Sequence, residues 1–275
     1  MKKHTHIIIP IIVLVVISII SGIVISLVGQ SIEHLDERTY ILNVPKNSND
    51  KLPLVVALHG SGGNGLEFQA FSGLDSEEFI TAYPNGSGFP TDWAGGECCG
   101  NSLNTDDVGF IRDLIVEVEA NYNVDTSRVF IIGFSSGGIM AYRLGCELSE
   151  YVTGIGVHSG TIEFSECAPD YPVSLIHIHG DEDLVVPLEG GEGLFDTVLF
   201  APAETGVKTY VVVDGCSSES LVVSEKVKQQ LWDNCSRNTA VSFVTVSEQG
   251  HGWFNSDSFS STKTMVDFLS AHPRS

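Results

Sequence analysis

Apolar residues in this chain form short runs that alternate with longer stretches in which apolar and polar positions are mixed. The short runs are rich in valine, isoleucine and leucine, which is typical of strands buried on both faces. They are Leu54–Leu58, Val129–Ile132, Gly154–Val157, Val173–His179 and Val241–Val246. The mixed stretches predict helices over Asp107–Tyr122, Gly138–Leu148, Leu221–Trp232 and Ser258–Ala271. This alternation indicates an α/β fold, with a mostly parallel twisted sheet and helices on both of its faces.

The N-terminus has a different pattern, because Ile7 to Val28 contains no charged residue. As a helix these 22 residues would extend about 33 Å, enough to cross the hydrocarbon core of a membrane. Two lysines precede the run and acidic residues follow it, which predicts that the rest of the chain lies outside the cytoplasm. A cleaved signal peptide is the alternative, although its apolar region is usually shorter and ends in small residues. We expect an N-terminal hydrophobic helix, acting as anchor or signal segment, in residues 1–30, and one domain in residues 31–275.

The sequence Gly133-Phe134-Ser135-Ser136-Gly137 lies between a predicted strand and a predicted helix. At such a turn the serine is held in a strained backbone geometry, and the glycines let strand and helix approach closely. The Ser135 hydroxyl then projects from the edge of the sheet, in front of a helix N-terminus that favours negative charge. An ordinary loop of glycine and serine would lack this context, so the pattern predicts a nucleophilic serine.

A serine nucleophile needs a base, and the base needs an acid that orients it. In folds with this turn, the acid and then the histidine follow the serine along the chain. The loop after the strand Val173–His179 carries Asp181 and Asp183, and spacing alone does not choose between them. His251 follows the strand Val241–Val246 and has glycine neighbours, which favours it among the nine histidines of the chain.

The other histidines are weaker candidates for the base. His177 and His179 lie within a strand run, and we expect them to be structural. His59 belongs to a different loop, and His158 follows another strand-like run without the glycine neighbours of His251. The order of serine, aspartate and histidine therefore favours His251.

A glycine-rich loop, His59-Gly60-Ser61-Gly62-Gly63, follows the apolar strand Leu54–Leu58. In folds with the serine turn, such a loop supplies one backbone N–H to the oxyanion, and the residue after the nucleophile supplies the other. Here these donors would be the amides of Ser61 and Ser136. Neither the phosphate-binding nor the dinucleotide-binding glycine pattern fits this loop.

Further motifs extend over the chain from about Thr39 to His272. They are Leu58–Gly63, Ala82–Gly86, Trp93 with Cys98-Cys99-Gly100, Asp106–Phe110, Gly133–Gly137, Met140–Leu144 with Cys146-Glu147, His179-Gly180 with Asp183 and Val186-Pro187, Asn234-Cys235, and Gly250-His251 with Trp253. Together they resemble the secreted esterases grouped as polyhydroxybutyrate depolymerases and feruloyl or acetyl-xylan esterases, which have the α/β-hydrolase fold. The resemblance implies that the domain in residues 31–275 is catalytic, with Ser135 as nucleophile, Asp183 as acid and His251 as base.

The chain departs from this family in positions that bear on the substrate rather than on the reaction. Asp181-Glu182 stands where the family commonly has Thr-Ala, and Phe254 stands where proline often follows the tryptophan. The segment Leu188–Ser220 is long and irregular for the family. We predict that Trp253 binds substrate as a flat wall for an aromatic acyl group, with packing under its loop as the alternative.

The composition limits the classes of molecule that the protein can bind. The chain has 14 basic and 35 acidic residues, and its net charge of −21 argues against nucleic acid and anionic polymers. Six cysteines in an exported domain favour disulfides. Several pairings are possible, and we favour Cys146–Cys167 and Cys216–Cys235. The ligand spacings of a zinc site are absent, so we expect neither a metal nor a cofactor.

The sequence therefore predicts an extracytoplasmic serine esterase, anchored to the membrane or secreted after signal cleavage. It would hydrolyse carboxylic esters of feruloyl, acetyl or 3-hydroxybutyrate type through an acyl-enzyme. A serine peptidase on the same fold and a catalytically silent surface-binding protein are the alternatives. We expect a small ester derived from polysaccharide or polyester as substrate, since no polymer-binding module follows the last predicted helix.

Overall fold

The structure is a computed structural model that describes residues 30–35, 37–46, 50–76, 78–96, 105–194 and 198–275. The predicted membrane helix falls in residues 1–29, which lie outside this part of the chain, as do Cys98 and Cys99. In the described ranges, every helix is too short or too polar to span a bilayer.

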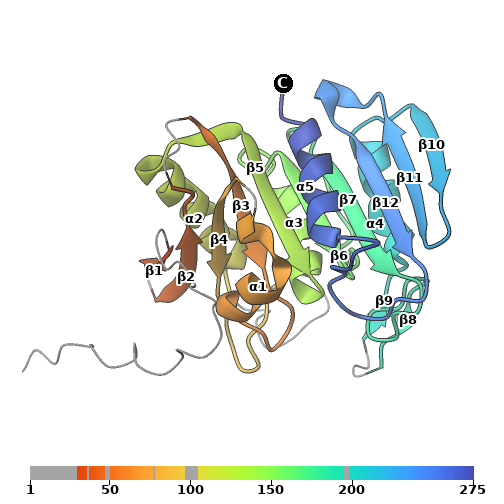
Figure 1. Cartoon of the computed structure of the whole chain (residues 1–275), viewed down its shortest axis with the longest axis horizontal. Coiled ribbons are helices and arrows are strands. Elements are labelled where there is room, and N and C mark those ends of the chain that lie inside the picture. Colours follow the sequence, from red (N-terminus) through yellow and green to blue (C-terminus); the bar gives the residue numbers. More distant parts are fainter. Residues whose placement is uncertain (1–29, 36, 47–49, 77, 97–104, 195–197) are drawn as a thin grey trace, which may run out of the picture.

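A ten-stranded sheet forms the centre of the described chain (Figure 1). In spatial order its strands are β1 (Gln30–Leu35), β2 (Arg38–Asn43), β4 (Ile80–Pro84), β3 (Leu52–Leu58), β5 (Val124–Phe134), β6 (Gly154–His158), β7 (Ser174–Gly180), β12 (Val241–Val246), β11 (Val227–Asp233) and β10 (Ser218–Val223). The central strands from β4 to β12 pair in parallel. The strands at both edges are antiparallel. The predicted mostly parallel sheet is therefore confirmed.

Helices cover both faces of the sheet (Figure 1). On one face lie α2 (Asp107–Asn121), α3 (Ser136–Glu147) and α4 (Ala203–Val213), and on the other lie α1 (Gly65–Ser72) and α5 (Ser261–Ala271). The short elements are β8 (Gly191–Glu192), which pairs with β9 (Leu199–Phe200), and the 3₁₀ turns Leu74–Ser76 and Ser236–Asn238. Alternate residues of β3 show why both faces need a cover. Leu54 and Val56 belong to the first core, and Val55 and Ala57 belong to the second.

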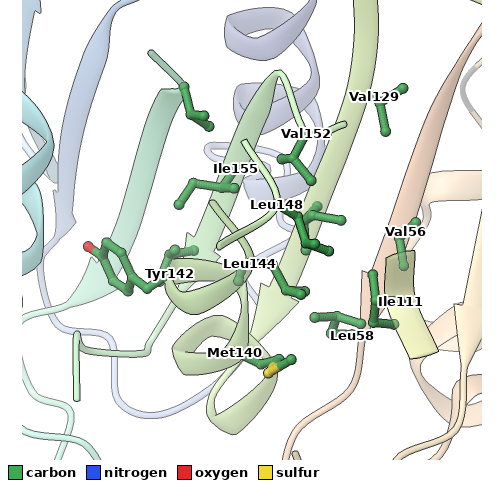
Figure 2. Close-up of a cluster of buried hydrophobic side chains, with 14 of the residues drawn as sticks. Val56, Leu58, Ile111, Val129, Met140, Tyr142, Leu144, Leu148, Val152 and Ile155 are labelled. Atoms are coloured by element: carbon green, nitrogen blue, oxygen red, sulfur yellow. The ribbon is translucent and has the colours of Figure 1, made fainter. Parts of the chain in front are cut away.

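The larger core holds α3 against the sheet. Figure 2 shows Met140 and Leu144 of α3 beside Leu58 of β3 and Ile111 of α2. Each of these side chains is buried, and burying a side chain of this size contributes about 1.5–3 kcal/mol. Because α3 begins directly after Ser135, this packing also fixes the position of the helix N-terminus behind the serine.

The helices predicted over Asp107–Tyr122, Gly138–Leu148 and Ser258–Ala271 are confirmed as α2, α3 and α5, with ends that differ from the prediction by at most three residues. α1 and α4 were not predicted, and α4 lies inside the segment Leu188–Ser220 that the sequence marked as irregular. The predicted disulfides Cys146–Cys167 and Cys216–Cys235 are both confirmed.

The helix predicted over Leu221–Trp232 is wrong, because this segment is the β10–β11 hairpin. Ser224 closes the turn, with its backbone N–H donating to the Val227 carbonyl at 2.8 Å. The apolar positions imitate a helical period, but the valines on both sides of the turn favour strands. Pairing of β11 with β12 then supplies backbone hydrogen bonds that a local pattern does not reveal.

Candidate active site

Ser135 occupies the sharp turn between β5 and α3. Its backbone has φ 56° and ψ −121°, a strained region for a residue with a side chain. A Cβ on Gly133 would lie 2.0 Å from the Gly137 carbonyl oxygen, and one on Gly137 would lie 2.3 Å from the Leu58 carbonyl oxygen. Only glycine fits these two positions, which explains locally why strand and helix can meet at this angle.

The structure brings Ser135, His251 and Asp183 into one hydrogen-bonded chain. His251 Nε2 lies 3.0 Å from Ser135 Oγ, and His251 Nδ1 lies 2.7 Å from Asp183 Oδ2. The Asp183 side chain is fully buried, whereas that of His251 is 15 % exposed. Nδ1 therefore donates to the carboxylate, and Nε2 is left to accept the serine proton, which is the arrangement of a base beside a nucleophile.

The Asp183 carboxylate is held by several donors. Its Oδ1 accepts the backbone N–H groups of Val185 and Val186, each at 2.9 Å. Its Oδ2 also lies 3.4 Å from His179 Nε2. Burial raises the pKa of Asp183, but hydrogen bonds from His179 and His251 outweigh burial and hold this pKa below its ordinary value. The carboxylate is therefore ionised at neutral pH.

Asp181, the other aspartate of this loop, points to a different partner. Its Oδ1 accepts the backbone N–H of Glu248 at 2.7 Å and so ties the end of β7 to the segment before His251. His158, the competing histidine, is fully buried between the hydroxyls of Ser159 and Ser261, at 3.1 and 2.8 Å. The hydrogen bonds of Asp181 therefore hold the end of β7 to the loop before His251, and those of His158 hold β6 to the start of α5.

The backbone amides predicted as oxyanion donors border the same site. The N–H of Ser136 belongs to the first turn of α3, where N–H groups have no partner within the helix. In the other loop, the Gly60 carbonyl accepts the Gly63 N–H at 3.0 Å and lies 2.8 Å from His59 Nδ1. Because a trans peptide directs its N–H opposite its carbonyl, the Ser61 N–H faces away from both groups.

A cavity of about 500 Å³ opens over Ser135. The polar residues and the glycine that line it are Gly60, Ser61, Asp92, Ser135, Ser136 and His251. The apolar residues that line it are Pro90, Phe134, Ile139, Val185, Val186, Val198 and Phe200. These apolar residues were not predicted as a substrate site, and two of them, Val198 and Phe200, lie in the segment Leu188–Ser220 that the sequence marked as irregular.

Trp253 is not among the residues that line this cavity. Its ring stacks on His158 with 4.8 Å between ring centroids, and its Nε1 donates to Thr262 Oγ1 at 3.0 Å. The ring also meets Phe68 of α1 edge-on. This position fits the alternative of packing beneath the His251 loop and gives no support to Trp253 as a substrate-binding wall. Over the described ranges, no cluster of three or more His, Cys, Asp or Glu side chains is arranged to hold a metal ion.

Comparison with known proteins places these features in context. Residues 107–209 match the family model described as Phospholipase/Carboxylesterase. The chain is 32% identical over 232 residues to the probable feruloyl esterase C of Aspergillus oryzae, covering 80% of this chain and 78% of that protein. It is 25% identical over 230 residues to feruloyl esterase B of Piromyces equi, covering 78% of this chain and 42% of that protein. The solved acetyl xylan esterase from Aspergillus awamori shares the fold, with a TM-score of 0.64 at 17% identity over 86% of this chain and 94% of that one.

Proposed function

Since the chain belongs to the feruloyl and acetyl-xylan esterase family of the α/β-hydrolase fold and is a carboxylic-ester hydrolase, we propose that it works through Ser135, His251 and Asp183. The observation that carries the proposal is the pair of hydrogen bonds between these residues, 3.0 and 2.7 Å long, with Ser135 and His251 lining the cavity. The alternatives of a peptidase and of a silent binding protein lose their support, because the curated relatives are esterases.

The acylation step follows from this geometry. His251 Nε2 takes the proton of Ser135 as the Oγ atom attacks the ester carbonyl. Asp183 holds the ring through Nδ1 and stabilises the positive charge that develops on it. The carbonyl oxygen becomes an oxyanion, for which the backbone N–H groups of Ser61 and Ser136 are the proposed donors. His251 then gives its proton to the leaving alcohol, and the acyl group stays on Ser135.

Deacylation repeats the same steps with water. His251 removes a proton from water, the resulting hydroxide attacks the acyl carbonyl, and the proton returns to Ser135 Oγ as the acid leaves. No cofactor enters either half-reaction. The route therefore needs only the side chains of the triad and the two backbone donors.

For the substrate, we propose that the cavity takes an aromatic acyl group of feruloyl type in preference to acetyl. An acetyl group would leave most of the 500 Å³ unfilled, whereas Ile139, Val186 and Phe200 offer apolar surface to a ring. The first relative named above is called a probable feruloyl esterase, which agrees with this choice.

Rates with matched esters test this assignment. Methyl ferulate, methyl acetate and a methyl 3-hydroxybutyrate differ in the acyl group alone, so kcat/KM compares the acyl site directly. We expect the feruloyl ester to react fastest, and Ser135→Ala to react with none of the three. A higher kcat/KM for the acetyl ester would contradict the proposed preference for a feruloyl group. An active Ser135→Ala variant would contradict Ser135 as the nucleophile.

For localisation, we propose an extracytoplasmic domain held at the membrane by residues 1–29. The two disulfides suit an oxidising compartment, and the uncharged N-terminal run is long enough for an anchor. Full-length protein should remain with the membrane after a high-salt wash, since salt removes only electrostatic attachment. A purified mature protein that begins near Gln30 would show instead that the run is a cleaved signal.

A further inference from the structure

Three aromatic side chains form a buried chain of hydrogen bonds behind Asp183. The hydroxyl of Tyr142 on α3 lies 2.7 Å from His177 Nδ1, and His177 Nε2 lies 2.9 Å from His179 Nδ1. The two imidazoles of β7 stack with 5.2 Å between centroids and 11° between planes. All three side chains are completely buried. Figure 2 shows Tyr142 leaving α3 on the side opposite Leu144 and Leu148.

The direction of the hydrogens in this chain follows from its last acceptor. His179 Nε2 lies 2.9 Å from the Val186 carbonyl oxygen, which can only accept, so Nε2 carries a hydrogen. A neutral His179 then accepts at Nδ1 from His177 Nε2–H, and His177 accepts at Nδ1 from the Tyr142 hydroxyl. In this arrangement every hydrogen of the three side chains has an acceptor. The reverse direction would leave the Tyr142 hydroxyl hydrogen without one among the recorded bonds, which is costly in a buried site.

This series of hydrogen bonds ends at the loop that carries Asp183, the acid of the proposed triad Ser135, His251 and Asp183. The Val186 residue whose carbonyl binds His179 is also one of the two residues whose N–H groups bind Asp183 Oδ1. The same His179 Nε2–H lies 3.4 Å from Asp183 Oδ2, the oxygen that binds His251. His179 therefore touches Asp183 twice, once directly and once through the backbone of its loop.

We propose that His179 is a positioning residue for Asp183, and that Tyr142 and His177 act through it by fixing its tautomer and ring orientation. The proposal rests on the triad proposed above and adds three residues that do not touch the substrate. Fixing the donor toward Asp183 keeps Oδ2 aimed at His251 throughout the reaction. A His179 ring free to turn or to change tautomer would let the carboxylate rotate away.

The charged and titratable groups around His179 come from three elements and two loops. They are His177 on β7, His158 on β6, Tyr142 on α3, and Asp183 and His251 in the loops at the carboxyl ends of β7 and β12. Burial holds the pKa of His158 and His177 well below the ordinary value and that of Tyr142 well above it, so these three are neutral at neutral pH. Loss of His179 should therefore act on the hydrogen-bonded pair of Asp183 and His251.

The test removes the donor and keeps a flat aromatic ring at the position. His179→Phe should lower kcat/KM by about 10- to 100-fold, the effect of one hydrogen bond to a charged group, with KM nearly unchanged. It should also move the acidic limb of the pH–rate profile upward by roughly 0.5 to 1 pH unit. The cause is that an Asp183 carboxylate with one hydrogen-bond donor fewer stabilises the positive charge of a protonated His251 ring more strongly. His179→Gln retains an N–H at the corresponding reach and should recover most of both effects.

Tyr142→Phe provides a second test that leaves both imidazoles in place. Removing the Tyr142 hydroxyl leaves His177 Nδ1 without its hydrogen-bond partner. The variant should lower kcat by a few-fold, which is less than the effect of His179→Phe. Tyr210→Phe is the matched control, because Tyr210 is equally buried beside Tyr142 but donates to the Tyr142 backbone carbonyl, off the chain. It should leave kcat unchanged even if the Tm falls.

The outcomes separate this proposal from the triad itself. If His179→Phe folds and retains the wild-type pH profile, or if Tyr142→Phe and Tyr210→Phe behave alike, the positioning role is overturned. Should His179→Phe fail to fold, the two tyrosine variants decide. Ser135→Ala and Asp183→Asn measured beside them show whether the triad assignment stands, because active variants at those positions would defeat that assignment first.

Discussion

Asp214 should make the stability of the protein fall as the pH rises toward neutrality. The residue follows the last turn of α4, and its side chain is fully buried. Burial raises the pKa of Asp214 to about 7, although the backbone N–H of Val173 and the hydroxyl of Thr239 oppose this change in pKa. The folded state therefore holds the proton, whereas the unfolded chain releases it near the ordinary pKa of 3.8.

The sign and size of the effect follow from this difference. Below about pH 4 both the folded and the unfolded state bind the proton, and the ionisation of Asp214 does not lower the free energy of unfolding. Between pH 4 and pH 7 the unfolded state loses its proton first, so the free energy of unfolding falls. Each pH unit is worth about 1.36 kcal/mol, so the total loss by pH 7 is about 4 kcal/mol as an upper value. For a domain of this size that corresponds to roughly 10 °C in Tm.

Asp214→Asn removes the titration and keeps the shape. Its Tm should match that of the wild type near pH 4, should exceed it increasingly up to about pH 7, and should exceed it by a constant margin above that pH, measured by thermal unfolding at constant ionic strength. Histidines that titrate in this range affect both proteins and cancel in the difference. Asp170→Asn, at an exposed position, controls for the loss of one negative charge. A difference in Tm that stays constant from pH 4 to pH 8 would refute the reasoning.

The remaining predictions concern the site. Asp183→Asn should lower kcat by about 10⁴-fold, whereas Asp181→Asn should lower it far less, since Asp181 binds only a backbone N–H. Steady-state rates that rank the two variants in reverse would contradict Asp183 as the acid. Gly137→Ala places a methyl group 2.3 Å from the Leu58 carbonyl oxygen and should abolish activity and lower the Tm, so a stable, active variant would contradict the packing of the serine turn. Phe200→Ala should lower kcat/KM about tenfold for a feruloyl ester and leave an acetyl ester nearly unaffected, and equal losses would remove Phe200 from the acyl site.

The serine turn could be predicted from sequence because its constraints are local. Glycine two residues before and two residues after Ser135 leaves space for the Gly137 and Leu58 carbonyls, and no distant segment is needed to recognise the pattern. The parallel sheet was predictable for a similar reason, since each buried strand carries its own apolar run. The β10–β11 hairpin was not, because β11 is stabilised by pairing with β12 and β10 by pairing with β11, rather than by the spacing of their own apolar residues.

The apolar lining of the cavity depends on how loops that are distant in sequence pack together, and the spacing of residues along the sequence does not predict this packing. Val198 and Phe200 reach the cavity from a segment without a regular apolar period, while Trp253, two residues after the base in sequence, packs on His158 instead. The two histidines of β7 lie between these cases. Their spacing of two places both rings on one face of the strand, but only the fold shows that Tyr142 and Asp183 stand at the two ends of the pair.

Covalent labelling of the nucleophile tests the central claim most directly. The wild-type domain and the Ser135→Ala variant are treated with a fluorophosphonate, which phosphonylates an activated serine, and the modified peptide is identified by mass spectrometry. The account predicts one modification, on the peptide containing Gly133 to Gly137, at the Ser135 Oγ atom, and no modification of the variant. Labelling of another serine in the wild type, or equal labelling of the variant, would contradict Ser135 as the nucleophile of this esterase.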